Sequence, residues 1–116
     1  MELKKFIKKK KIITIFEPHR YSGVTSLKSK LSKAFVKSDL VLITPLYAAG
    51  EKNKLNFNLI KFAKLISKNS NTQVIIVNNQ KELSNYLKKN LISDEIIIGM
   101  GAGSISQWMK DLKFNL

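Results

Sequence analysis

Short, continuously apolar runs alternate with amphipathic segments along this chain of 116 residues. Runs rich in β-branched residues that lack polar alternation are typical of strands buried on both faces. Such strands are predicted at residues 12–16, 39–44, 73–77 and 95–98. Between them, apolar residues recur three and four positions apart, and this spacing predicts helices with one buried face.

The predicted helices occupy the intervals between these strands. A leading helix at 3–7 runs into the lysines at 8–11. A second helix follows the loop and cap residues Ser22, Gly23 and Thr25 and ends near Lys37. Later helices start near Leu59, span residues 80–90, and begin at a cap on Ser104. Their apolar faces comprise Leu3, Phe6 and Ile7; Leu27, Leu31, Ala34 and Phe35; Leu59, Phe62, Ala63 and Ile66; Leu83, Tyr86 and Leu87; and Ile105, Trp108, Met109 and Leu112.

This alternation predicts the fold class. Apolar strands separated by amphipathic helices form a mostly parallel sheet with helices on both faces. Right-handed crossovers then give a small, doubly wound α/β fold. The length and the absence of a linker or internal repeat predict a single domain over residues 1–116.

The charge of the chain leaves two interpretations open. The formal net charge of +13 suits a nucleic-acid-binding module. However, Arg20 is the only arginine among many lysines, and base-reading proteins usually carry several arginines. We therefore favour a codon bias toward lysine and do not expect a nucleic-acid partner.

Composition also argues against metal-binding and membrane proteins. The absence of cysteine and the single histidine argue against a metal site on this chain. No apolar run approaches the roughly 20 residues that cross a bilayer, and the basic N-terminus lacks the apolar segment of a signal peptide. We expect no membrane insertion and a cytoplasmic location.

The candidate chemistry follows the predicted strands. Residues 18–22, 47–51 and 99–104 each come after a strand, so all three should meet at the carboxyl edge of the sheet. Ligands bind at this edge in open parallel sheets. We therefore expect one ligand site built from these three segments.

Four side chains in these segments are candidates for substrate binding. Arg20 can hold a carboxylate or phosphate through two parallel hydrogen bonds, and His19 can donate to an anion or move a proton near neutral pH. Tyr47 and Glu51 lie in a loop whose small residues let a ligand approach. Plainer roles also stay open: a backbone hydrogen bond for His19, a surface ion pair for Arg20 and an ordinary loop carboxylate for Glu51.

The glycine-rich turn is the third candidate. Gly101, Gly103 and Ser104 could present backbone N–H groups to an anion at a helix start. Alternatively, the glycines permit a sharp turn with close packing. The spacing is not that of a dinucleotide site, and the chain contains no phosphate loop for ATP.

Together, the three segments resemble a known family. Phe16–Ser22 (FEPHRYS), Leu46–Glu51 (LYAAGE) and Gly99–Ile105 (GMGAGSI) are similar to the C-terminal, Rossmann-like domain of the Mur ligases. Within that family they most resemble the branch that joins L-alanine to UDP-N-acetylmuramate. The resemblance covers nearly the whole chain, and the first two motifs are the most specific.

The resemblance implies a three-domain, cytoplasmic enzyme of peptidoglycan synthesis. In that family, ATP phosphorylates the muramyl carboxylate, and the amine of the amino acid then attacks the acyl phosphate. ATP and magnesium are bound mainly by a central domain, and UDP-N-acetylmuramate by a first domain. We expect both domains to be absent from this chain, which should carry no cofactor and no catalytic residue of its own and should be inactive alone.

Residue roles follow from the same resemblance. Arg20 matches an arginine expected to bind the amino-acid carboxylate or nearby anions, and His19 matches the adjacent histidine. Tyr47 and Glu51 match the loop that borders the cleft. The chain departs from the family at Gly23, where a second arginine is usual.

Other readings stay open beside this one. The acceptor could be a murein peptide, as in the related ligase that attaches whole peptides to UDP-N-acetylmuramate. The chain itself could be an excised domain, a split-gene fragment or a degenerate copy.

Overall fold

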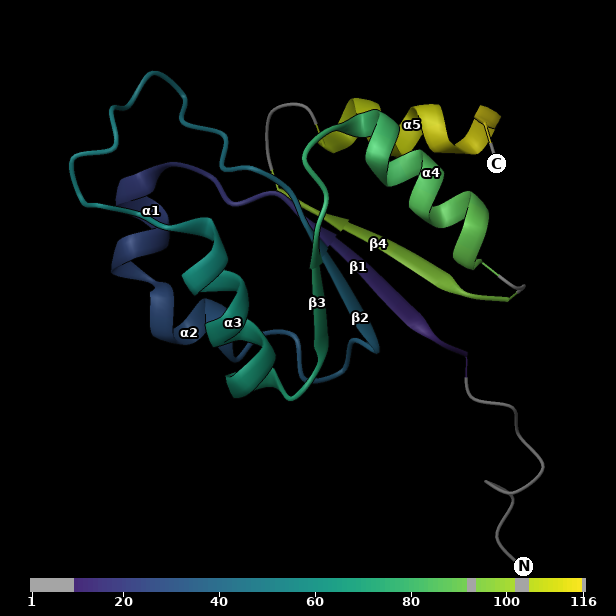
Figure 1. Cartoon of the computed structure of the whole chain (residues 1–116), viewed down its shortest axis with the longest axis horizontal. Helices are drawn as coiled ribbons and strands as arrows, with labels where there is room; N and C mark the ends of the chain where they lie inside the picture. Colours follow the sequence, from purple (N-terminus) through teal and green to yellow (C-terminus); the bar gives the residue numbers. More distant parts are fainter. Residues whose placement is uncertain (1–9, 92–93, 102–104, 116) are drawn as a thin grey trace, which may run out of the picture.

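The computed structural model describes residues 10–91, 94–101 and 105–115, with side chains as far as Leu112. Figure 1 shows the arrangement of the elements. The strands are β1 (Ile12–Phe16), β2 (Leu40–Ile43), β3 (Gln73–Ile76) and β4 (Ile96–Met100). The helices are α1 (Tyr21–Ser26), α2 (Lys28–Ser32), α3 (Leu59–Ser70), α4 (Gln80–Asn90) and α5 (Ile105–Asn115).

The described strands form one parallel sheet in the order β3-β2-β1-β4. Strand β1 lies inside the sheet, with Thr14 opposite Val41 of β2 and Ile98 of β4. Because every strand points the same way, the segments that follow them emerge at one edge, the carboxyl edge.

Helices cover both faces of the sheet, α1, α2 and α3 on one side and α4 and α5 on the other (Figure 1). Each side has its own apolar core. The buried part of the core under α4 and α5 comprises Ile13, Ile15, Leu40, Leu42, Val77, Leu83, Leu87, Ile105 and Leu112. The buried part of the core under α1–α3 comprises Phe16, Val24, Phe35, Val41, Ile43, Phe62, Ala63 and Ile66. The predicted doubly wound α/β fold is confirmed.

The helix after β1 differs from the prediction. Residues expected in a loop, including Ser22 and Gly23, form α1, and the predicted helix toward Lys37 ends at Ser32 as the separate helix α2. Local packing explains the early start, since Val24 is buried in the α1–α3 core. The helix is interrupted at Leu27, which has φ −109° and ψ 14°.

Strand β4 also runs further than expected. Gly99 and Met100, predicted as part of a turn, pair with Ile15 and Phe16 of β1. Gly99 allows this strand to pack under α5, because a Cβ there would lie 2.8 Å from the Cγ of Met109. The other predicted strands and the helix at 80–90 agree with the structure within one or two residues. The predicted leading helix at 3–7 lies outside the described residues.

A buried hydroxyl joins α2 to α3. The Ser70 hydroxyl donates to the Ser32 carbonyl at 2.6 Å and accepts from the Phe35 N–H at 3.1 Å. Ser70 is only 1% exposed, so water cannot replace these bonds. This serine satisfies the backbone where the chain leaves α2, and it holds Phe35 in the core.

We expect Ser70→Ala to lower the free energy of unfolding by about 2–4 kcal/mol, because it leaves two buried backbone groups without their partner. Urea unfolding followed by circular dichroism measures this loss. Ser67→Ala is the matched control on the same helix, since the Ser67 hydroxyl makes an exposed bond to the Thr72 carbonyl. Equal losses in the two variants would contradict the assignment.

No helix among the described residues is both long enough and apolar enough to cross a bilayer.

Candidate functional site

Backbone hydrogen bonds continue beyond the end of β1 on both sides. The Glu17 N–H donates to the Met100 carbonyl at 2.8 Å, and the Thr44 N–H donates to the Phe16 carbonyl at 2.9 Å. The segment after β1 is therefore held between the ends of β2 and β4. This position brings the segments after β1, β2 and β4 to one edge, as the sequence predicted.

A short bridge links the first two segments. The Tyr47 N–H donates to the Pro18 carbonyl, and the Arg20 N–H donates to the Tyr47 carbonyl, both at 2.8 Å. His19 and Tyr47 pair across this bridge in parallel orientation. Their rings stack with centroids 5.6 Å apart and planes inclined by 14°. The bridge thus aligns two predicted site residues that are far apart in sequence.

Arg20 lies at the turn from this bridge into α1. Its backbone has φ 62° and ψ 139°, a conformation that non-glycine residues rarely adopt. Strain of this kind costs on the order of 1–3 kcal/mol and persists only where neighbouring contacts impose it. Here the bond to Tyr47 fixes the Arg20 N–H, and the Arg20 carbonyl accepts from the Val24 N–H at 3.1 Å. The side chain is exposed at the edge, available to an anion.

Glu51 and Ser22 form a second link between the two loops, which we call the clasp. One Glu51 carboxylate oxygen accepts from the Ser22 hydroxyl at 2.6 Å, and the other accepts from the Ser22 N–H at 3.2 Å. The hydroxyl bond is the main cause that lowers the pKa of Glu51 from its ordinary value of 4.5. The Ser22 N–H adds to this effect, and the Arg20 charge contributes less. Glu51 therefore acts here as a bond between loops.

Glu17 is a buried polar residue of this edge that the sequence motifs do not single out. It follows the buried strand β1 directly and is itself only 4% exposed. Its backbone lies against Gly101, where an added Cβ would be 2.7 Å from the Glu17 carbonyl oxygen. The sequence signal was present, since a carboxyl side chain stands between the apolar Phe16 and the rigid Pro18. The sequence predicts only a loop at Ser22, and its bonds to Glu51 come from the tertiary structure.

The structure favours the packing interpretation for the first part of the glycine turn. Gly101 has φ 145° and contacts the Glu17 backbone too closely for any side chain. Gly103 and Ser104 lie outside the described residues, so their expected role in an anion site stays a prediction. Among the described residues, no group of three or more His, Cys, Asp or Glu side chains could hold a metal ion.

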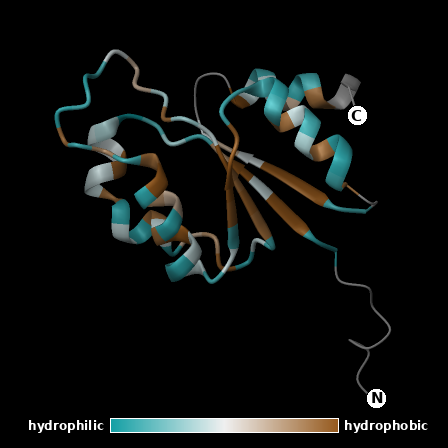
Figure 2. Cartoon of the chain, viewed as in Figure 1, coloured by the Kyte–Doolittle hydropathy of each residue, from teal (hydrophilic) through white to brown (hydrophobic). Residues whose placement is uncertain are grey.

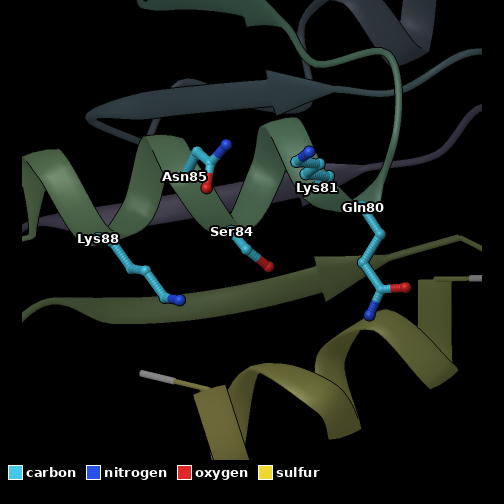
Figure 3. A pocket seen from close by; sticks show the side chains of 5 residues that line it. All are labelled: Gln80, Lys81, Ser84, Asn85 and Lys88. Carbon is cyan, nitrogen blue, oxygen red and sulfur yellow. The ribbon is translucent and has the colours of Figure 1, made fainter.

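The surface has hollows at two relevant places. One lies beside the clasp and is lined by Tyr21, Ser22, Glu51, Lys52, Lys54 and Leu55. Its lysines give it a positive lining. Another lies on α4, where Figure 3 shows Gln80, Lys81, Ser84, Asn85 and Lys88. Because this second hollow contains none of the predicted site residues, the clasp hollow is the better candidate.

Comparison with curated proteins identifies relatives over most of the chain. A UDP-N-acetylmuramate–L-alanine ligase from Pelagibacter ubique is 44% identical over 90% of this chain and 23% of its own length. Ligases of the same name from Sulfurihydrogenibium and Fusobacterium nucleatum are 37% and 38% identical, each over 88% of this chain. The matched region is the C-terminal part of these proteins. The chain belongs with the C-terminal part of the Mur ligases.

This chain spans only 21–23% of the length of these relatives. No family model matches it. A solved structure, a murein peptide ligase from Psychrobacter arcticus, superposes with a TM-score of 0.65 over 97% of this chain and 23% of that one. At 15% identity this likeness concerns the fold alone. The Mur ligase resemblance and the Rossmann-like fold predicted from the motifs are confirmed.

We expect Gly101→Ala to destabilise the fold by roughly 1–3 kcal/mol, because it adds a strained φ and a contact with the Glu17 backbone. Chemical denaturation gives this value. Gly23→Ala is the control, since a Cβ at Gly23 meets nothing within 4 Å, and it should stabilise α1 slightly. Equal stability of the two variants would contradict the close packing of Gly101.

The clasp should depend on pH in one direction. The pKa of Glu51 is lower in the folded state than in the unfolded chain. The clasp therefore stabilises the fold above the unfolded-state pKa, and this stabilisation is lost as the pH falls through the folded-state pKa. Glu51→Gln should therefore lower the melting temperature at about pH 6–7, and this difference should shrink below about pH 4.

Thermal unfolding across this pH range measures the effect. Asp94→Asn serves as the control, because Asp94 is exposed on the loop before β4 and away from the clasp. A difference between wild type and Glu51→Gln that stays constant down to pH 3 would rule out the clasp as its source.

Proposed function

We propose that this chain is the C-terminal domain of an ATP-dependent UDP-N-acetylmuramate–L-alanine ligase of peptidoglycan synthesis. In this role it positions the amino-acid substrate and closes the active site, within a cytoplasmic enzyme. The match to the C-terminal part of ligases of that name supports the proposal. The single structural observation that carries it is the bridge that places His19, Arg20 and Tyr47 together at the carboxyl edge.

Arg20 binds the carboxylate of the incoming amino acid. Its guanidinium is exposed and can form two parallel hydrogen bonds with a carboxylate. The bridge and α1 fix its backbone on both sides, so less conformational freedom is lost when the substrate binds. This fixed position orients the substrate amine toward the activated carboxyl group.

His19 and Tyr47 line the same edge. Their stacked rings offer a partly apolar wall with polar atoms at its rim, and both side chains are exposed. His19 can donate a hydrogen bond to an anionic group of the bound substrates. Glu51 holds the two loops through Ser22 and gives the wall its shape.

The described residues offer no cluster of carboxylates for magnesium and no phosphate loop for ATP. We propose that ATP, magnesium and UDP-N-acetylmuramate are bound mainly by the two earlier domains. The phosphorylation of the muramyl carboxylate belongs to those domains, and this chain contributes positioning and the exclusion of water.

Gly23 occupies the position where a second arginine is usual in the family, and this difference could affect the ligase activity. A side chain can be added there without a clash, since a Cβ at Gly23 meets nothing within 4 Å. An arginine at this position, as is usual in the family, would stand one residue beyond Ser22 and near Arg20 in the chain. The variant Gly23→Arg therefore tests whether a second cation at this edge strengthens substrate binding.

The test is to supply the two earlier domains of the Pelagibacter relative, in trans or by fusion, and to measure formation of UDP-N-acetylmuramoyl-L-alanine. We expect product from the combined protein, with higher activity for Gly23→Arg. Absence of product from both forms would overturn the proposed activity, provided that circular dichroism shows both chains folded.

Within the active combination, Arg20→Ala should lower kcat/KM for L-alanine by about 10- to 100-fold, mainly through KM, because a charge-assisted hydrogen bond contributes roughly 1.5–3 kcal/mol. Lys89→Ala, which removes an exposed cation on α4, should leave both constants unchanged. An unchanged KM in Arg20→Ala would remove Arg20 from the substrate site.

The related murein peptide ligase activity is the second candidate, and the structural likeness to such an enzyme favours testing it. Comparing free L-alanine with an L-alanine-containing tripeptide as acceptor separates the two activities. Preference for the tripeptide would assign the chain to the peptide-attaching branch.

A further inference from the structure

The side of the sheet covered by α1–α3 is uniformly basic. Residues 21–38 and 52–71, which include these three helices, contain four and five lysines respectively but no aspartate or glutamate. Each of these lysines is exposed. On the opposite side of the sheet, α4 and α5 carry Glu82 and Asp111 among their lysines. A codon bias explains why the cations are lysines, but it does not explain why one side lacks carboxylates.

The lysines of α3 form one stripe along the helix. Lys61, Lys64 and Lys68 are three and four positions apart, so they project from one surface of α3. The residues that α3 buries in the core, including Phe62 and Ile66, lie on the opposite surface. The stripe therefore points away from the sheet and into solvent.

The start of α2 and the loop before α3 extend this stripe. Lys28 and Lys61 line the same small hollow, and Leu55 lines it with them. Leu55 also lines the clasp hollow on its other side. The Asn69 side-chain amide donates to the Ser32 hydroxyl at 2.9 Å, which helps to hold α2 beside α3. The lysines thus lie on one continuous surface.

Two aliphatic side chains are exposed among these lysines. Leu55 and Ile60 are 52% and 58% exposed. Ile60 precedes Lys64 by four positions, so the two side chains are neighbours on α3. Figure 2 shows teal, hydrophilic residues interleaved with brown, hydrophobic ones along α2 and α3. The surface, which we call the basic face, comprises Lys28, Leu55, Ile60, Lys61, Lys64 and Lys68.

We propose that the basic face binds the surface of an anionic lipid bilayer. The headgroups of such a bilayer supply negative charge over a broad area, which complements four lysines on one surface. The lysine stems and the two exposed aliphatic side chains enter the headgroup region, while the ammonium groups contact lipid phosphates. Binding of this kind is peripheral and leaves the helices packed on the sheet.

The composition of the basic face favours lipid over nucleic acid. Proteins that bind nucleic acids commonly use arginines to read bases and aromatic rings to stack on them, and the basic face contains neither. Arg20, the only arginine of the chain, lies at the carboxyl edge with His19 and Tyr47, outside this face. The proposal therefore goes beyond the ligase function and does not depend on it.

Vesicle sedimentation with the whole chain tests the proposal. Vesicles of phosphatidylcholine alone are compared with vesicles that contain phosphatidylglycerol as the anionic lipid. We expect at least roughly tenfold tighter binding to the anionic vesicles, and loss of this difference at about 0.5 M salt, where the charges are screened. Equal binding to the two kinds of vesicle would overturn the proposal.

Two triple variants then locate the binding surface. The α3 variant removes the stripe through Lys61→Gln, Lys64→Gln and Lys68→Gln. The α4 variant is the matched control and carries Lys81→Gln, Lys88→Gln and Lys89→Gln. Each variant loses three positive charges from the net +13 of the chain. The α3 variant should bind anionic vesicles about 30- to 100-fold more weakly, and the α4 variant less than about threefold more weakly. Equal losses would overturn the proposal, because net charge alone would then explain binding.

Ile60→Ser separates lipid from nucleic acid, since it changes the apolar part of the basic face without removing a charge. We expect roughly 3- to 10-fold weaker binding to anionic vesicles and unchanged binding to a DNA oligonucleotide of random sequence. Vesicle binding equal to that of the wild type would contradict the proposal. Tighter binding of the wild type to the oligonucleotide than to anionic vesicles, at physiological salt, would assign the face to nucleic acid instead.

Discussion

Strand β1 is hydrogen-bonded on both sides, and the carboxyl edge depends on this pairing. Its position between β2 and β4 continues past Phe16 through the Glu17 bond to Met100 and the Thr44 bond to Phe16. Pro18 has no N–H to donate, yet its carbonyl accepts from Tyr47 and extends the order by one more step. The backbone positions of the loop residues at this edge are therefore fixed by hydrogen bonds that continue the pairing of the sheet.

That geometry explains how an unfavourable backbone conformation persists at Arg20. The residue lies where the extended bridge must turn into α1, and its neighbours hold it there from both directions. The clasp between Ser22 and Glu51 closes the same loop from outside. Since each bond at an exposed edge contributes modestly, the arrangement relies on several of them acting together. A fixed guanidinium suits recognition of a planar carboxylate.

Much of the fold could be predicted because its signals are local. Unbroken apolar runs marked the strands, and the helix at 80–90 was predicted with its observed bounds. The start of α1 was missed because Ser22 and Gly23 are typical loop residues, whereas burial of Val24 decides the helix. The sequence predicts a turn at Gly99, because the close approach of Met109 that favours a glycine in the strand joins residues of different elements.

The sequence predicts that the candidate residues lie at one edge of the sheet, but it does not predict the contacts they make there. Topology places His19, Arg20, Tyr47 and Glu51 at one edge. Their predicted role in substrate binding comes from the similarity of these motifs to those of the Mur ligases. The bond between Ser22 and Glu51 joins residues 29 positions apart, so no local sequence pattern predicts it. The same holds for the ring stack of His19 and Tyr47. These long-range contacts give Glu51 a structural role between the two loops, beside its predicted role in substrate binding.

The central claim is that the sheet's hydrogen bonding extends into the loop that presents Arg20. Amide hydrogen exchange, followed residue by residue by NMR at neutral pH, measures it directly. The amides of Arg20 and Tyr47 should exchange far more slowly than that of Lys52, which lies in the same loop region and donates to no backbone carbonyl of the described residues. Exchange of Arg20 and Tyr47 as fast as Lys52 would contradict the account.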